Sequence, residues 1–159
     1  MSHKARSSAL KVLTGGEHYD IINDMSNEKL LEVKKYLDAD RFVRLAGIRI
    51  VGLDDGCATV SADIGPEHLN AGGAVQGGML YTLSDFAFAV LTNAYHPMTV
   101  TQSSTITYIR AARTDRVTAT AREIVRAGHN CVVEVVVKDA DGEIVCTGSF
   151  NGFISGKKE

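Results

Sequence analysis

The sequence has almost no excess charge of either sign. Its 159 residues include 17 Lys and Arg against 19 Asp and Glu, which gives a formal net charge of −2 and a pI near 6.2. Such a chain has no strong positive field that would attract a phosphate backbone or an anionic membrane. We therefore expect neither nucleic acid nor a membrane among its partners.

Cysteine is scarce as well. Cys57, Cys131 and Cys146 are odd in number, lie far apart and form no C-x-x-C pair, and no histidines stand at matching spacing. This pattern supports neither a disulfide framework nor a zinc site. We expect no bound metal.

Long hydrophobic runs are also missing. Residues 1–16 carry positive charge but no apolar core of signal-peptide length, which predicts a cytoplasmic protein. The most apolar segment, residues 79–95, is short for a bilayer and contains Ser84, Asp85 and Asn93. A buried helix inside a protein is the better interpretation.

What the chain does have is the composition of one globular domain, with 45% hydrophobic and 23% charged residues. Residues 1–24 show no clear period and predict a flexible arm. Residues 25–159 predict a single domain that starts with an additional helix. Ser26 or Asn27 would cap that helix, and Gly47 would end it.

The first helix is predicted to bury one face. Leu30, Val33, Leu37 and Phe42 stand at helical spacing within its sequence. Two β-prone runs follow at residues 48–53 and 57–64, joined by the turn sequence Asp54-Asp55-Gly56.

The second half of the chain predicts one long helix and four strands. A glycine-rich loop over residues 65–78 leads into the apolar helix, and Pro97 ends it. Further β-prone runs cover residues 99–109, 116–125 and 130–154, and the last folds back at Asp141-Gly142. A helix that is apolar nearly all round must be wrapped. We therefore predict an α+β fold in which a curved antiparallel sheet surrounds a long central helix, with a partner subunit covering the remainder.

Asp85 is the most anomalous residue of that helix. It lies among Leu83, Phe86 and Phe88, where an ionised carboxylate is costly unless it is paired. Two interpretations are open: a functional acid, or a structural carboxylate that accepts hydrogen bonds from Tyr81 or Thr82.

The glycines before the helix offer a second candidate feature. Gly77-Gly78 at a helix start would expose backbone N–H groups at the positive end of the helix dipole, where a developing oxyanion can bind. The simpler alternative is that Gly72, Gly73, Gly77 and Gly78 serve a tight turn and close packing. No phosphate-loop or dinucleotide motif is present.

Polar side chains near the loop are further candidates. Asn70 and Gln76 would orient a carbonyl or a water through their amides, or simply cap the loop. His68, His96 and His129 are isolated and favour surface or capping roles. Ser84 has no nucleophile-elbow motif around it.

From about residue 47 to residue 153 the chain resembles the hotdog-fold acyl-CoA thioesterases, and within them the phenylacetate-pathway type, like 4-hydroxybenzoyl-CoA thioesterase. The motifs are HLNAGGAVQGGMLYTLSDFAFAVLTNA, TITYIRAAR and DADGEIVCTGSF. The resemblance implies the hotdog fold and hydrolysis of an aromatic or medium-chain acyl-CoA. It implies no cofactor beyond the coenzyme A of the substrate.

The resemblance also implies site residues. Asn70, Gln76-Gly77-Gly78 and Asp85 fall on the family's Asn, His-Gly-Gly turn and helical Asp. The Gly77 amide would polarise the thioester carbonyl. Asp85, reaching in from a neighbouring subunit, would attack that carbonyl or activate a water, while Asn70 would hold the water or the carboxylate. Active sites would then lie between the subunits of a homodimer or homotetramer.

Two positions depart from the family pattern. Gln76 replaces the usual histidine, so it can donate a hydrogen bond but cannot change protonation state between pH 5 and 8. Ala111 stands where proline is common, with a local effect only.

Arginines are candidates to bind the phosphates of coenzyme A. Arg110, Arg113 and Arg126 would act as guanidinium partners at the mouth of the site, or equally be solvated strand-edge side chains.

Two other functions stay open on sequence alone. One is a non-hydrolytic acyl-CoA binding module that has lost turnover with the histidine. The other is a hydratase or dehydratase on the same fold, for which His68 is the nearby candidate base.

Overall fold

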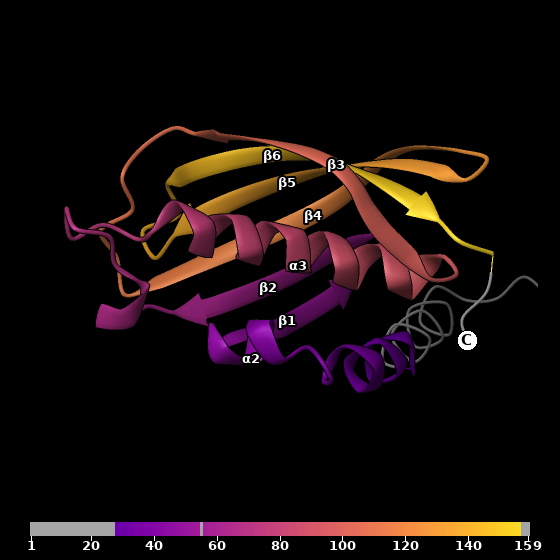
Figure 1. Cartoon of the computed structure of the whole chain (residues 1–159), viewed down its shortest axis with the longest axis horizontal. Helices are drawn as coiled ribbons and strands as arrows, with labels where there is room; N and C mark the ends of the chain where they lie inside the picture. The colour runs from indigo at the N-terminus through magenta and orange to yellow at the C-terminus, as the bar shows by residue number, and fades with distance from the viewer. Residues whose placement is uncertain (1–27, 55, 157–159) are drawn as a thin grey trace, which may run out of the picture.

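The structure is a computed structural model that describes residues 28–54 and 56–156. The arm predicted over residues 1–24, the predicted cap at Ser26 or Asn27, and Asp55 of the first turn lie outside these ranges. Within them, an antiparallel sheet curves around one long helix, as predicted (Figure 1).

Six strands form one sheet in the order β1-β2-β4-β5-β6-β3, and every neighbouring pair is antiparallel. Strands β1 and β3 therefore form its two edges. The strands are β1 (Ile48–Asp54), β2 (Cys57–Asp63), β3 (Thr99–Tyr108), β4 (Arg116–Ala127), β5 (Asn130–Asp139) and β6 (Ile144–Ile154).

Both predicted hairpin turns are confirmed. Gly56 between β1 and β2 has φ +75°, and Gly142 between β5 and β6 has φ +84°. Side chains with a Cβ rarely adopt this left-handed conformation, so glycine at these positions lets the strands reverse direction within a few residues.

The central helix is α3 (Gly77–Tyr95), which begins two residues earlier than its apolar run. Alternating small and branched residues of the sheet face it, and Phe88 stacks on Phe150 of β6 with ring centroids 5.9 Å apart. The sheet-facing residues of β4 and β5 are fully buried, as the alternation predicts: Val117, Ala119, Ala121, Val133, Val135 and Val137. Among the described residues, no helix is both long and apolar enough to cross a membrane.

One stripe of α3 stays outside the sheet's cover. Tyr81, Thr82 and Asp85 stand three, four and seven residues after Gly78, and Ala89 lies four residues further on; all five are exposed or half-buried. The C-terminal end of the helix contacts the sheet through its capping residue, His96, which pairs through Nε2 with Glu123 of β4.

The predicted N-terminal helix is two helices. One covers residues 28–37, and α2 (Arg41–Leu45) follows after Asp40, whose side chain accepts hydrogen bonds from the N–H groups of Phe42 and Val43 at 3.0 Å. This cap starts a new helix with a new direction, so Val43 is buried in place of Phe42, which is 64% exposed. The prediction that Phe42 shares the buried face is wrong, whereas Val33 is buried as predicted and Leu30 and Leu37 pack against the core.

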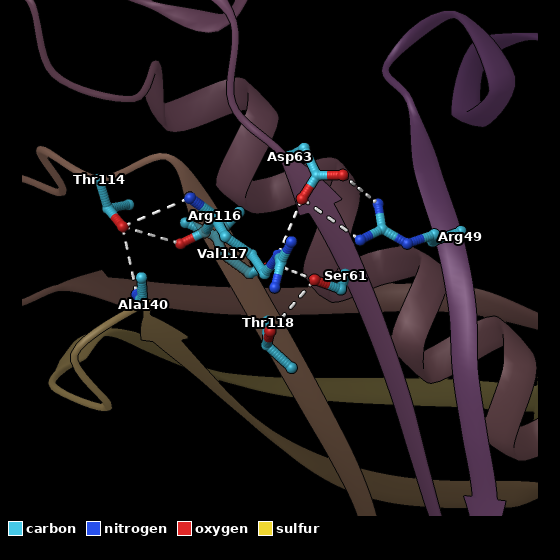
Figure 2. A network of polar contacts seen from close by, with 8 residues as sticks. All are labelled: Arg49, Ser61, Asp63, Thr114, Arg116, Val117, Thr118 and Ala140. Atoms are coloured by element: carbon cyan, nitrogen blue, oxygen red, sulfur yellow. Dashed lines mark hydrogen bonds and ion pairs between the residues drawn. The ribbon is translucent and has the colours of Figure 1, made fainter.

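A charged cluster joins three strands just before the glycine-rich loop. The Asp63 carboxylate at the end of β2 contacts Arg49 of β1 at 2.9 Å and Arg116 of β4 at 2.8 Å (Figure 2). The hydrogen bond from Arg116, followed by that from Arg49, lowers the pKa of Asp63 below its usual value. The loop therefore leaves the sheet from a strand end that is tied on both sides.

Candidate functional site

The residues between the 3₁₀ turn η1 (Pro66–His68) and α3 form a small hairpin. Leu69 and Val75 form an antiparallel bridge, and the Asn70 N–H donates to the carbonyl of Ala74 at 2.8 Å. Gly73 at its tip has φ +69°, which explains one of the paired glycines by conformation. The hairpin delivers the chain to the first turn of α3.

Asn70 folds its side chain over the tip of the hairpin. Its Oδ1 accepts hydrogen bonds from the N–H groups of Gly72 at 2.9 Å and Ala74 at 3.2 Å. The predicted loop-capping role is therefore present. The amide NH₂ group finds no acceptor among the described residues and remains able to donate to a ligand.

Gln76 is the N-cap of α3 and uses its amide in the same way. Its Oε1 accepts from the N–H groups of Gly78 and Met79, the latter at 3.3 Å. Two of the unpaired donors of the helix start are thereby satisfied. The NH₂ group of Gln76 is again left without an acceptor in the part of the chain that the structure describes.

The N–H of Gly77 differs from those of its two neighbours. No acceptor is bonded to it within the described residues, and it stands at the first position of a 19-residue helix. The positive end of the helix dipole and a free donor coincide there, which is the arrangement that binds an anion or an oxyanion.

Tyr108 covers this glycine and was not predicted. Its hydroxyl donates to the Gly77 carbonyl at 2.9 Å, and a Cβ added to Gly77 would lie 3.3 Å from the Tyr108 ring. Any side chain at position 77 would therefore make the ring move by a few tenths of an ångström. The two residues are 31 positions apart, and the motif gives no local signal for their contact.

Asp85 accepts a hydrogen bond of 2.6 Å from the Thr101 hydroxyl of edge strand β3. The predicted partners Tyr81 and Thr82 are wrong: Tyr81 pairs with the Ser104 hydroxyl at 2.6 Å, and Thr82 donates to the Gly78 carbonyl at 2.9 Å. Thr82 follows the usual habit of helical threonine, which bonds to the carbonyl one turn back. The carboxylate is half-buried on the uncovered stripe of α3.

Spacing along the helix separates the acid from the oxyanion donor. Gly77 and Asp85 are eight residues apart, a rise of about 12 Å at 1.5 Å per residue. A carboxylate that acts on a carbonyl bound at Gly77 must lie within hydrogen-bonding reach of it. Asp85 of the same chain is too distant for that.

Two hollows flank the Gln76-Gly77-Gly78 turn. A hollow of about 400 Å³ is lined by Asn70, Gly77, Tyr108 and Arg110 among others. A larger groove of about 660 Å³ lies along Gln76 and Gly78. The turn thus borders both hollows. It contains three of the predicted site residues, and a fourth, Asn70, lines the smaller hollow beside it.

The three candidate arginines divide. Arg113 donates to the carbonyls of Gly72 at 2.9 Å and Gly73 at 3.2 Å, at the tip of the hairpin. Arg110 pairs with Glu143 at 2.7 Å and lines the smaller hollow together with Asn70. Arg126 lies ten residues further along β4 than Arg116, or about 33 Å of extended strand. The structure therefore does not bring Arg126 to the hairpin of its own chain.

The remaining polar candidates have structural contacts. Ser84 is buried and donates to the Leu80 carbonyl at 2.8 Å. His68 accepts a hydrogen bond at Nδ1 from the Gly65 N–H at 3.0 Å. The Nδ1 lone pair is therefore engaged, and the neutral ring carries its proton on Nε2. His129 Nδ1 contacts the Ile154 carbonyl at 2.9 Å. Across the described ranges, no cluster of His, Cys, Asp or Glu could hold a metal ion.

This fold and site define a class of protein. The Thioesterase superfamily model matches residues 72–146, from the hairpin through α3 into β6. The chain belongs to this superfamily, has its hotdog fold and is an enzyme of the thioester-hydrolase class.

Particular relatives share most of the domain. The acyl-coenzyme A thioesterase PaaI of Escherichia coli K12 is 30% identical over 99 residues, covering 62% of this chain and 71% of PaaI. The solved structure of the E. coli PaaI protein superposes with a TM-score of 0.79 at 23% identity, covering 84% of this chain and 98% of that one.

Two other solved structures are similar. That of a mutant of the phenylacetic acid degradation protein PaaI from Thermus thermophilus has a TM-score of 0.68 at 30% identity, covering 73% of this chain and 100% of that one. A hypothetical thioesterase of Streptococcus pneumoniae TIGR4, solved with coenzyme A, has a TM-score of 0.66 at 26% identity, covering 70% and 91%.

Proposed function

We propose that the protein hydrolyses the thioester of aromatic or medium-chain acyl-CoA to the free acid and coenzyme A. The observation that carries this is the Gly77 N–H at the start of α3, beside the NH₂ groups of Asn70 and Gln76, none of which has an acceptor within residues 28–54 and 56–156. Relatives named as acyl-CoA thioesterase and solved with coenzyme A support the substrate class.

In the proposed reaction the thioester carbonyl accepts a hydrogen bond from the Gly77 N–H. As charge develops on that oxygen, the helix dipole and the amide groups of Asn70 and Gln76 stabilise it. Water, activated by the Asp85 carboxylate, or Asp85 itself adds to the carbonyl carbon. The C–S bond then breaks and the coenzyme A thiolate leaves.

We infer further that Asp85 is supplied by a second subunit, because about 12 Å of helix separates it from Gly77 of its own chain. Edge strand β3 carries exposed apolar side chains, Val100 at 45% and Tyr108 at 51%, and α3 leaves one stripe uncovered. Unpaired strand edges of this kind are interaction sites. A homodimer or homotetramer with sites between subunits satisfies both features.

The phosphates of coenzyme A would meet Arg110 and Arg113 beside the hairpin, and no further cofactor is required. Arg126 could join them only from another subunit, since it lies at the far end of β4.

The test is release of free thiol from aromatic and straight-chain acyl-CoAs by wild type, Asp85→Asn and the control Asp38→Asn. Asparagine keeps an acceptor for Thr101 but removes the base or nucleophile, so turnover should fall at least about a hundredfold while the fold is kept. Asp38 is an exposed carboxylate outside the site, and its variant should match wild type.

The protein's own thiols must be excluded from that assay. Burial raises the pKa of the Cys146 thiol to about 11 and also raises that of Cys131, and both side chains are buried. Cys57 is partly exposed, so a Cys57→Ser background removes the most accessible of the three thiols.

An unchanged rate in Asp85→Asn would refute the proposed mechanism. Binding of acyl-CoA without turnover by wild type would favour the binding module, because Gln76 uses its oxygen for capping and cannot move a proton. Loss of activity in His68→Ala but not in Asp85→Asn would favour the hydratase.

A further inference from the structure

The larger groove beside the turn has walls from two parts of the chain. Phe42 and Leu45 of α2 form one side, and Met79 and Tyr81 of α3 form the other. Figure 1 shows α2 alongside β1, below the first half of α3. At about 660 Å³ the groove lies within the range of roughly 300–1,000 Å³ that small-molecule sites occupy.

Two large apolar side chains of α2 are unusually exposed. Phe42 is 64% and Leu45 is 80% exposed, although α2 has only five residues. Burying such side chains against an apolar ligand is favourable in proportion to the area removed from water. This wall also lies outside residues 72–146, so it is an addition to the part of the domain that the superfamily model covers.

The groove borders the proposed reaction centre through neighbouring residues. Gln76 and Gly78 line it, whereas Gly77, between them, lines the smaller hollow with Asn70 and Arg110. A thioester carbonyl bound at the Gly77 N–H would lie at the boundary of the two. Its two substituents, the acyl group and the coenzyme A moiety, would then leave on opposite sides.

Chemistry decides which substituent goes where. The smaller hollow includes Arg110, and Arg113 stands close by at the hairpin tip, so guanidinium groups are available to phosphates on that side. The larger groove offers apolar surface from Phe42, Leu45 and Met79, with Glu67 and His68 also in its lining. An apolar acyl group matches the groove and a phosphorylated carrier matches the hollow.

We propose that the groove between α2 and α3 binds the acyl group, and that Phe42 and Leu45 set the preference for its length. This rests on the proposed thioesterase function and specifies its substrate: acyl groups long enough to reach α2, such as medium-length alkyl or arylalkyl chains, are preferred over acetyl. Each methylene added within the groove should raise kcat/KM about fourfold until the groove is filled.

The experiment compares kcat/KM for acetyl- to dodecanoyl-CoA and phenylacetyl-CoA in wild type, Leu45→Ser and Phe42→Ser. We expect each serine variant to lower the ratio of long-chain to acetyl kcat/KM about tenfold, through loss of apolar contact. Leu31→Ser is the matched control, because Leu31 is 67% exposed on the preceding helix but does not line the groove. Its ratio should equal that of wild type.

Binding of S-alkyl-CoA thioethers separates this inference from the proposed hydrolysis. Affinity that rises with alkyl length and falls in Leu45→Ser supports the groove even if no thioester is turned over. If Leu45→Ser and Leu31→Ser hydrolyse thioesters with the same chain-length profile, the proposed thioesterase function stands. The proposal that the groove binds the acyl group is then overturned. A lower oligomeric state of Leu45→Ser in sedimentation, relative to Leu31→Ser, would mean that a second copy occupies the groove, which also overturns it.

Discussion

Gln76 uses the oxygen of its side-chain amide for capping, and we propose that its NH₂ group serves a ligand. The oxygen caps α3 through Gly78 and Met79, and the NH₂ group has no acceptor among the described residues. The histidine of the family pattern would add a proton that moves near neutral pH, which an amide lacks. Capping and donation to substrate are separable here by substitution.

Gln76→Ala should lose both the helix cap and the NH₂ donor, whereas Gln76→Ser should lose only the NH₂ donor. Serine is a good N-cap, so it should retain most of the unfolding free energy, whereas alanine should lose about 0.5–1 kcal/mol, measured by urea unfolding. Both variants lack the NH₂ donor, and kcat for acyl-CoA should fall about tenfold or more in each. Wild-type kcat in Gln76→Ser would show that capping is the only role.

At the same scale, the need of the Asp85 carboxylate for a hydrogen-bond donor could be predicted from the sequence, but the donor could not. A carboxylate among apolar helical residues needs a hydrogen bond, and the sequence offers Tyr81 and Thr82 one turn away. Thr101 supplies it instead, from a strand 16 residues later. Contact between Asp85 and Thr101 depends on how β3 lies against α3, which local spacing does not determine.

Among the elements, the N-terminal helices show how one residue redirects the chain. A single amphipathic pattern covers residues 30–42, yet Asp40 caps a second helix and Phe42 becomes exposed. The cap was present in the sequence as Asp40, two residues before Phe42 and three before Val43. The hydrogen bonds of this cap outweigh the amphipathic pattern of residues 30–42, because the Asp40 side chain satisfies two backbone N–H groups at once.

The cluster of Arg49, Asp63 and Arg116 joins β1, β2 and β4 and contributes to the free energy of unfolding in a pH-dependent way (Figure 2). Because the pKa of Asp63 is lowered in the folded state, its contribution is present above the ordinary value of 3.8 and is lost as pH falls through the lowered pKa. Asp63→Asn should therefore lower the urea midpoint at pH 7 in low salt and have less effect in high salt.

The difference between Asp63→Asn and wild type should disappear at acid pH, once the wild-type carboxyl is protonated. Asp54→Asn is the control, since Asp54 is exposed on β1 and none of the ion pairs of the described residues includes it. An equal shift in both variants would mean that the two arginines add nothing specific.

For the whole molecule, the order of elements and both hairpin turns followed from patterns within a few residues. The wrapping of α3 followed from its apolar surface, since a helix of this kind must be covered. Contacts across the sheet did not follow: Tyr108 reaches Gly77 because β3 pairs with β6 at the sheet's edge. The apolar groove likewise depends on where α2 lies, which no motif encodes.

Subunit mixing tests whether sites form between chains. Asp85→Asn and Asn70→Ala would each inactivate a homodimer, but a pair with one subunit of each kind would keep one intact site if Asp85 acts across the interface. Random mixing should then restore about a quarter of wild-type turnover in a twofold-symmetric dimer. No recovery after unfolding and refolding the mixture would place both residues in one chain's site.

The eight-residue separation of Gly77 and Asp85 along α3 also has a genetic consequence. One rigid helix would serve two sites, giving its first turn to one and its third to the other. A subunit with both Asp85→Asn and Asn70→Ala would then damage both sites of any pair it joins. With equal expression of normal and doubly altered alleles, only about a quarter of pairs would be fully normal. Such an allele would be dominant negative, although it encodes a folded protein.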